Sequence, residues 1–144
     1  MATPKSAPSA GSTIIPGLRY RNAPAAIDWL CNAFGFEKQL VVSGENGTIA
    51  HAQLTFGSGM IMLGSVREDD HRFSLQQPDQ TNGAETQCPY VVVSDCDAHY
   101  ARAKSAGAQI VFDIHDEGHG GRGYACRDLE GHLWYFGSYN PWHT

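Results

Sequence analysis

The sequence predicts an α+β fold in which two tandem βαβββ modules form a curved, cup-like mixed sheet with the helices outside. The first supporting observation is a set of recurring landmarks: Gly107 follows Gly35 by 72 residues, and Gly131 follows Gly59 by 72 residues. The second is that each half contains a helix-like segment with capping residues at both ends. The third is an alternation of apolar and polar residues in strand-like segments, which is typical of a sheet with two unlike faces.

The first module is predicted over residues 13–66. A strand at Thr13–Tyr20 is followed by a helix that starts after the N-cap Asn22, carries Pro24 in its first turn and ends at Gly35. Apolar residues recur every three or four positions along this helix, as expected of a helix with one buried face. Three strands follow, at Phe36–Ser43, Thr48–Phe56 and Met60–Val66.

The second module is predicted over residues 87–139, after a polar linker at residues 67–86. Its helix runs from Cys96 to Ala106, with Asp95 as the N-cap and Gly107 as the terminator. Its strands are predicted at Cys88–Ser94, Gln109–Ile114, Gly123–Arg127 and His132–Ser138. Residues 1–12 consist largely of Ala, Ser, Pro and Gly and are interpreted as a flexible tail before a single domain at residues 13–144.

Composition excludes several classes of function. The 144 residues carry a formal net charge of −5 and contain no block of Lys or Arg, so neither a nucleic acid nor a membrane surface is expected as a partner. No apolar run reaches the length of a membrane span and no secretory signal is recognisable, which favours a cytoplasmic protein. The four cysteines form no C-x-x-C pair and are interpreted as reduced, mostly buried thiols.

Four groups of residues carry a resemblance to a known family. They are Gly17–Tyr20 with Asn22–Leu30, Phe34–Phe36, His51–Leu54 with Ile61–Gly64, and Gly123–Trp134. Together they resemble the vicinal-oxygen-chelate superfamily, which includes glyoxalase I, bleomycin-resistance proteins and extradiol dioxygenases. Leu129 stands where the glyoxalase-like hairpin usually has Pro. The resemblance covers Thr13 to Trp142 and implies a ligand-binding cup and a homodimer.

The resemblance also implies four metal-ligand positions, and this chain departs from the pattern at all of them. They fall on Ile15, Met62, Cys88 and Tyr135. Ile and Met cannot take the place of His or a carboxylate as ligands of a hard or borderline divalent metal ion, and Tyr is a poor ligand near neutral pH. We therefore expect no cofactor, with a non-standard divalent-metal site as the alternative.

Residues of the first module supply part of the candidate ligand-binding set. His51 and Gln53 share the polar face of their strand, while Ala52 and Leu54 form the apolar face. His51 is also the one candidate for acid–base catalysis, since a histidine titrates near neutral pH. Arg19 is expected on the same face of its strand as Ile15, the first of the implied metal-ligand positions. The resemblance implies that an Arg at this place holds an anionic group of the ligand.

Residues of the second module complete the set. Its segment from His115 to Gly121 contains metal-friendly residue types, but its glycines favour a mobile loop that serves as a lid. Arg127 and Asp128 are expected to brace the final hairpin. The full ligand-binding prediction comprises Arg19, His51, Gln53, Met62, Cys88, Tyr90, His119, Arg122 and Tyr135.

Two functions remain open from the sequence. One is a binding protein that holds a small, partly aromatic or anionic compound in a metal-free cup, for sequestration or resistance. The other is a glyoxalase-like lyase, isomerase or dioxygenase. It would need either a non-standard metal site, with His51, His119 and Cys88 as donors, or metal-free acid–base chemistry by His51.

Overall fold

The computed structural model describes residues 11–143, so most of the predicted tail lies outside the described residues. Within this range the chain divides into two compact units: unit one holds residues 11–31 and 35–73, and unit two holds residues 32–34 and 74–143. The amide of Ser12 donates to the Ser58 carbonyl oxygen at 3.1 Å, which attaches the end of the tail to a turn of unit one. Neither described helix is long and apolar enough to cross a membrane.

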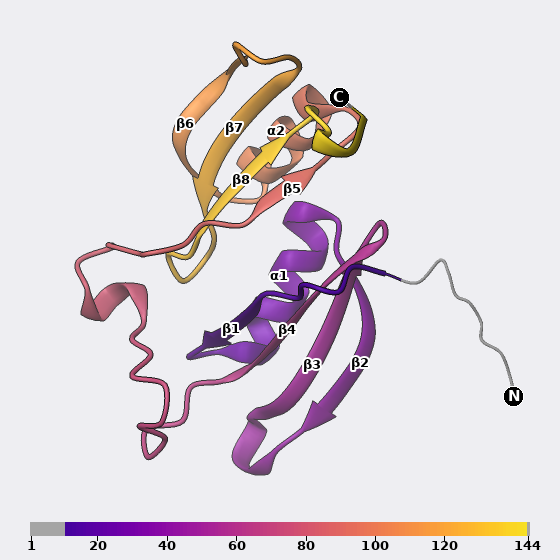
Figure 1. The fold of residues 1–144 in the computed structure, drawn as a ribbon. Coiled ribbons are helices and arrows are strands. Elements are labelled where there is room, and N and C mark those ends of the chain that lie inside the picture. The colour runs from indigo at the N-terminus through magenta and orange to yellow at the C-terminus, as the bar shows by residue number, and fades with distance from the viewer. Residues whose placement is uncertain (1–10, 144) are drawn as a thin grey trace, which may run out of the picture. The chain divides into compact units, whose positions relative to one another are not determined.

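Unit one contains a four-stranded mixed sheet (Figure 1). Strands β1 and β4 pair in parallel, and the other neighbours in the order β1-β4-β3-β2 pair antiparallel. Its elements are β1 (Gly17–Tyr20), α1 (Ala23–Phe34), β2 (Glu37–Ser43), a 3-10 turn (Glu45–Gly47), β3 (Ile49–Phe56) and β4 (Gly59–Ser65).

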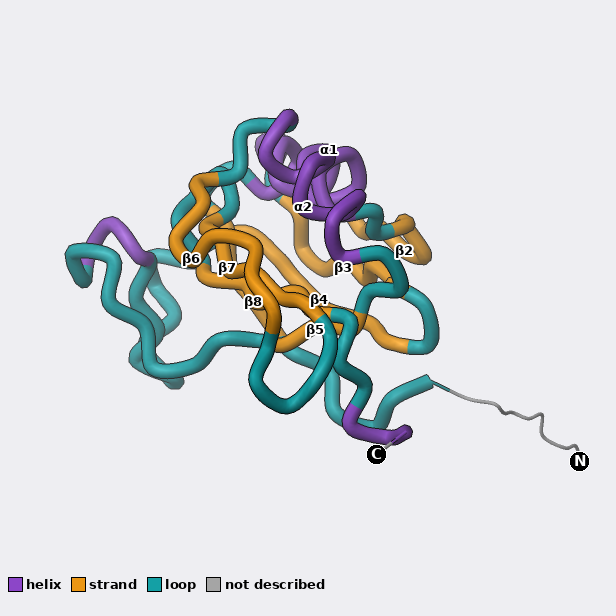
Figure 2. Tube along the Cα trace, turned by 90° about the horizontal axis from the view of Figure 1, so that it is seen from above, coloured by secondary structure: helices purple, strands orange, loops and turns teal. Residues whose placement is uncertain are grey.

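Unit two repeats this plan, with the sheet order β5-β8-β7-β6. Its helix α2 packs against β6 and β7 (Figures 1 and 2). Its elements are a 3-10 turn (Pro78–Gln80), β5 (Tyr90–Val92), α2 (Cys96–Ser105), β6 (Gln109–Asp116), β7 (Arg122–Arg127), β8 (Leu133–Gly137) and a 3-10 turn (Pro141–His143). The α+β class and the two tandem βαβββ modules are therefore confirmed, while the cup stays a prediction.

The predicted helix caps are present. The Asn22 side chain accepts from the Ala25 amide at 3.2 Å, and the Asp95 side chain accepts from the Ala98 amide at 3.1 Å. Gly35 has a φ of 89°, in the left-handed region, and its amide donates to the Cys31 carbonyl. Glycine adopts this conformation without the steric cost that a Cβ would add, so the chain turns out of α1 at this residue.

Several predicted boundaries were wrong. The first strand begins at Gly17 and not at Thr13, and the strand predicted at Cys88–Ser94 is confined to Tyr90–Val92, which leaves Cys88 outside it. A third correction concerns β6. The strand expected to end at Ile114 continues through His115 and Asp116, because these residues pair with Gly123 and Arg122 across the hairpin. The glycines that suggested a loop from His115 onward are confined to the turn, where Gly120 and Gly121 have positive φ. The correction places His115 on the sheet.

Alternate residues of β7 and β8 form the core of unit two. The residues Tyr124, Cys126, Trp134 and Phe136 are fully buried. Phe34, in the last turn of α1, is also fully buried and belongs to unit two. The Phe34 and Phe136 ring centroids lie 4.7 Å apart. In unit one, Ala52 and Leu54 are fully buried, and His51 and Gln53 are partly exposed, as the predicted alternation requires.

A buried carboxylate braces the β7–β8 hairpin, as the sequence predicts. Asp128 accepts hydrogen bonds from the amides of Glu130 and His132 and from the indole nitrogen of Trp134, each at 3.0 Å. Arg127 donates to the carbonyl of Gly131 at 2.8 Å. Three donors satisfy the Asp128 carboxylate, so its burial costs little and the hairpin is held in one geometry.

His99 ties α2 to this core. Its Nδ1 lies 2.7 Å from the Tyr124 hydroxyl, and its Nε2 lies 2.8 Å from the carbonyl oxygen of Phe34. Because a carbonyl oxygen only accepts, Nε2 carries a proton, and in the neutral ring Nδ1 accepts from Tyr124. Desolvation by burial lowers the pKa of His99.

We expect the free energy of unfolding to fall on acidification, partly through His99. Above about pH 6.5 the residue is neutral in both states and contributes no pH dependence. Below this value the unfolded chain binds a proton that folded His99 resists, which favours unfolding by at most about 1.4 kcal/mol per pH unit. Urea unfolding of His99→Gln should show a shallower slope between pH 7 and 5 than the wild type. The exposed His71→Gln serves as control, and an unchanged slope in His99→Gln would contradict the assignment.

Candidate functional site

One row of side chains crosses the sheet of unit two on the face away from its core. Tyr135 pairs with Tyr90 on one side and with Ala125 on the other, and Ala125 pairs with Phe112. Directly paired residues share a face, and Trp134 and Phe136 face the core, so this row faces outward. Two of the predicted ligand-binding residues, Tyr90 and Tyr135, therefore lie side by side, with ring centroids 5.7 Å apart.

Glycines in the neighbouring row make room for larger groups. Gly123 pairs with Gly137 on one side and with His115 on the other. A Cβ on Gly137 would come 3.0 Å from the Tyr90 ring, and a Cβ on Gly123 would come 3.0 Å from the Tyr135 ring and would collide with the Glu117 carboxylate. The two glycines thus form a floor over which the Tyr90 ring and the Glu117 carboxylate lie.

A hydrogen-bonded group of three side chains occupies this floor. The Tyr135 hydroxyl donates to Oε2 of Glu117 at 2.6 Å. Nε2 of His115 lies 3.2 Å from the Tyr135 hydroxyl oxygen and 3.2 Å from Oε1 of Glu117. We call these residues the Glu117 triad. The Phe112 ring lies beside it in a tilted contact with His115, at 4.1 Å between ring centroids.

The triad holds a charged carboxylate next to a neutral phenol. The hydrogen bond from Tyr135 lowers the pKa of Glu117, and contact with His115 lowers it further, against an opposing effect of desolvation. Desolvation and the neighbouring Glu117 both raise the pKa of Tyr135. Glu117 is therefore ionised and Tyr135 protonated at neutral pH. The group can accept hydrogen bonds and attract positive charge, but it offers no phenolate.

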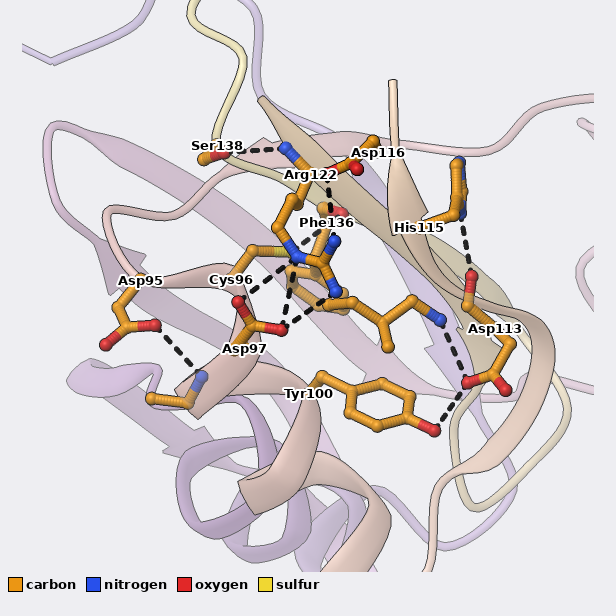
Figure 3. Close-up of polar contacts among 12 residues, drawn as sticks. Asp95, Cys96, Asp97, Tyr100, Asp113, His115, Asp116, Arg122, Phe136 and Ser138 are labelled. Carbon is orange, nitrogen blue, oxygen red and sulfur yellow. Dashed lines mark hydrogen bonds and ion pairs between the residues drawn. The ribbon is translucent and has the colours of Figure 1, made fainter. Parts of the chain in front are cut away.

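The strand that carries His115 is attached to α2. The Tyr100 hydroxyl donates to the Asp113 side chain at 2.5 Å, and the backbone carbonyl of Asp113 lies 2.7 Å from Nδ1 of His115 (Figure 3). The hydrogen bond from Tyr100 lowers the pKa of Asp113. The carbonyl contact fixes one edge of the His115 ring, so the other edge faces Glu117.

Arg122 and His119, both predicted to bind ligand, lie on the β6–β7 hairpin with other partners. Arg122 forms ion pairs with Asp116 at 2.9 Å and with Asp97 at 3.2 Å (Figure 3). His119 makes an edge-on contact with Tyr139, at 4.4 Å between ring centroids. Among the hydrogen bonds of the described residues, none joins Arg122 or His119 to the Glu117 triad. The predicted roles of these two residues in ligand binding, and of their loop as a lid, stay predictions.

A second polar row lies on unit one. His51 Nε2 is 2.8 Å from the side-chain oxygen of Gln53, and the Gln53 amide donates to Gln39 on β2. An amide oxygen only accepts, so Nε2 of His51 donates and, in the neutral ring, Nδ1 keeps its lone pair. This arrangement fits the predicted acid–base candidate.

Arg19 and Met62 lie on the same face of unit one. Met62 pairs with Gln53, and Arg19 pairs with Gly64. A Cβ on Gly64 would come 2.7 Å from Nη1 of Arg19, so the guanidinium lies across the glycine. Four predicted residues (Arg19, His51, Gln53 and Met62) therefore share one face, and their ligand-binding roles stay predictions.

The residues at the implied metal positions do not fit a divalent ion. Ile15 and Met62 offer no hard donor, and the Tyr135 hydroxyl is protonated and donates to Glu117. No group of three or more His, Cys, Asp and Glu side chains within residues 11–143 is placed to hold a metal ion. We therefore derive no chemical step through a metal.

The ligand-binding set predicted from the sequence omits three residues of this site: Phe112, His115 and Glu117. The available signal was the alternation of His115 and Glu117 beyond Asp113, which continues the period of a strand. The glycines that follow these residues favoured a loop over a strand in the sequence analysis. Phe112 carried no signal, because a register irregularity between Phe112 and His115 changes which residues face outward.

A model of the Glyoxalase/Bleomycin resistance protein/Dioxygenase superfamily matches residues 14–136. The chain belongs to this superfamily. The resemblance inferred from the sequence motifs is thereby confirmed at the level of the family.

Individual members of the superfamily extend the comparison. The chain is 30% identical over 122 residues to the uncharacterized protein Mb0911c of Mycobacterium bovis, covering 85% of this chain and 80% of that protein. The crystal structure of TioX from Micromonospora sp. ML1 shares 37% identity with a TM-score of 0.68, covering 88% of this chain and 94% of that chain. The fosfomycin resistance protein FosX from Mesorhizobium loti shares 10% identity with a TM-score of 0.60, covering 92% and 95%, and this likeness concerns the fold alone.

We expect Gly123→Ala to displace the Glu117 triad without unfolding unit two. Its Cβ would collide with the Glu117 carboxylate, whereas the backbone of Gly123 lies outside the positive-φ region and tolerates a side chain. The hydrogen bond from Tyr135 should weaken, and the pKa of Glu117 should rise toward its usual value in a carboxyl-detected NMR titration. Gly118→Ala is the matched control, because nothing lies within 4 Å of a Cβ there. An equal pKa of Glu117 in the wild type and in Gly123→Ala would contradict this prediction.

The cysteines should differ sharply in reactivity. Cys88 is exposed, whereas Cys96 and Cys126 are buried and burial raises their pKa to about 11 and about 12. Desolvation also raises the pKa of Cys88, so it reacts as an ordinary surface thiol and not as an activated nucleophile. A disulfide reagent at pH 8 should therefore label Cys88 first, and Cys88→Ser should remove this phase. Labelling of Cys126 before denaturant is added would show that the core of unit two is open.

Proposed function

We propose that this protein binds a small planar organic ligand, without a metal ion, on the outward face of the unit-two sheet. The biological purpose we propose is sequestration of the compound or resistance to it. The observation that carries the proposal is the Glu117 triad, a partly desolvated charge with fixed hydrogen-bond geometry among aromatic rings. A mostly apolar surface with a few placed polar groups is the usual character of a small-molecule site.

Two further facts support the proposal. Ile15 and Met62 lack the donor atoms of a divalent-metal site, which favours recognition through hydrogen bonds and ring contacts. The description of the superfamily to which the chain belongs includes bleomycin resistance proteins, which agrees with the proposed role.

A second candidate function rests on His51. Its Nε2 is oriented by Gln53, and this leaves Nδ1 of the neutral ring as a base. The candidate activity is metal-free proton transfer of the lyase or isomerase type. Turnover of a bound compound that is lost in His51→Ala, with binding retained, would favour this candidate. The homodimer and the cytoplasmic location implied by the sequence also stay predictions.

A thermal-shift screen of planar organic compounds tests the binding function. A compound present at 100 times its Kd stabilises the folded state by about 2.7 kcal/mol, which raises the Tm of a chain of this size by roughly 5–10 °C. Tyr135→Phe keeps the ring but removes the hydroxyl that donates to Glu117, so affinity for such a compound should fall about tenfold. Chelation with EDTA should leave the affinity unchanged.

Tyr100→Phe is the matched control for this experiment. It removes a hydroxyl that donates to the Asp113 side chain, whereas His115 contacts the backbone carbonyl of Asp113. Affinity should therefore stay at the wild-type value. Loss of binding on chelation would overturn the metal-free site, and absence of any stabilising compound would overturn the binding function.

A further inference from the structure

We infer that the ligand of this site is a planar organic cation, held by the Glu117 carboxylate and the rings of Phe112 and Tyr90. The inference rests on the proposed function and narrows it to a chemical class. It follows from the charge of the Glu117 carboxylate, from the exposure of the aromatic rings around it, and from the ion pairs that Arg122 forms with other residues.

The first step is the unfilled capacity of the Glu117 carboxylate. Its side chain is 11% exposed and it accepts one hydrogen bond at Oε2, from Tyr135, with His115 near Oε1. An ionised carboxylate has about four lone-pair sites, so part of its capacity is unused. A negative charge removed from water needs a compensating cation, and the ion pair that Glu117 forms within residues 11–143 depends on protonation of His115.

The second step is that the Arg on the same hairpin does not supply this cation. Arg122 is paired with Asp97 and Asp116. Asp116 of the hairpin and Asp97 of α2 thus hold Arg122 in ion pairs outside the triad, while Glu117 remains directed at the sheet face.

The third step is the aromatic surface beside the charge. Phe112 is 50% exposed and Tyr90 is 39% exposed. The face of an aromatic ring attracts a cation. The cation–π contacts found among the described residues involve Phe73 and Tyr100, not the rings of this site. A carboxylate next to exposed rings is the chemistry that recognises a flat, positively charged organic molecule, whereas an anion would be repelled by Glu117.

His115 lies where it would compete with such a cation for the Glu117 carboxylate. Its Nδ1 faces the carbonyl oxygen of Asp113 and its Nε2 faces Glu117, so the protonated ring donates to both. Tyr135 and Phe112 also face this ring, and His119 acts on Glu117 through its charge. A protonated His115 and a cationic ligand therefore compete for one carboxylate.

Calorimetry with three probes of the same ring system tests the inference. The probes are 1-naphthylmethylammonium, neutral 1-naphthalenemethanol and anionic 1-naphthylacetate. We expect the cation to bind at least tenfold more tightly than the alcohol, and the anion to bind most weakly. Glu117→Gln should lower affinity for the cation about tenfold and leave affinity for the alcohol unchanged. Glu45→Gln, which removes an exposed carboxylate of unit one, should change neither value.

The outcomes separate the inference from the proposed function. Equal affinities of the three probes, preference for the anion, or a cation affinity unaffected by Glu117→Gln would overturn the inference while leaving the binding function in place. The same holds if none of the probes binds but compounds from the screen do, and their affinity is unaffected by Glu117→Gln. If neither the probes nor any compound in the thermal-shift screen binds, the proposed function fails and the inference fails with it.

Discussion

The burial of Tyr124, Trp134 and Phe136 is the constraint on which the candidate site depends. These rings pack with Phe34 in a core from which water is excluded, and a strand can turn only every second residue toward that core. Tyr135 is therefore forced to the opposite face. Asp128 adds to this constraint, because its bond to the Trp134 indole fixes the hairpin from which β8 begins. The direction of Tyr135 is thus settled by its neighbours, not by its own contacts with Glu117.

Glycine shapes the site as much as any side chain does. Gly123 lies under the Glu117 carboxylate and Gly137 lies under the Tyr90 ring, in one row of the sheet. Gly64 has the same role in unit one, where the Arg19 guanidinium crosses it. A side chain at any of these positions would lift the functional group off the sheet. Since none of the three has a positive φ, the reason for glycine here is the space above it and not backbone conformation.

The sequence predicted the modules well because their signals are local. Asn22, Asp95 and Gly35 act within one helical turn, and the brace at Asp128 acts within a single hairpin. The Glu117 triad could not be predicted in the same way. His115 reaches Tyr135 through a strand pairing across a glycine turn, and an irregular register between Phe112 and His115 sets which residues face outward. Such a shift reverses the face of every later residue, and composition does not encode it.

The superfamily fold keeps its architecture here while the chemistry of its sheet face changes. At one implied metal position Tyr135 offers a hydroxyl whose pKa is raised by desolvation and by Glu117, so the oxygen keeps its proton and donates it to the carboxylate. A protonated phenol is a hydrogen-bond donor and a poor metal ligand. The Glu117 carboxylate keeps its charge, beside rings that attract positive charge. An organic cation is therefore the partner that restores the electrostatic balance of the face without requiring any further donor from the chain.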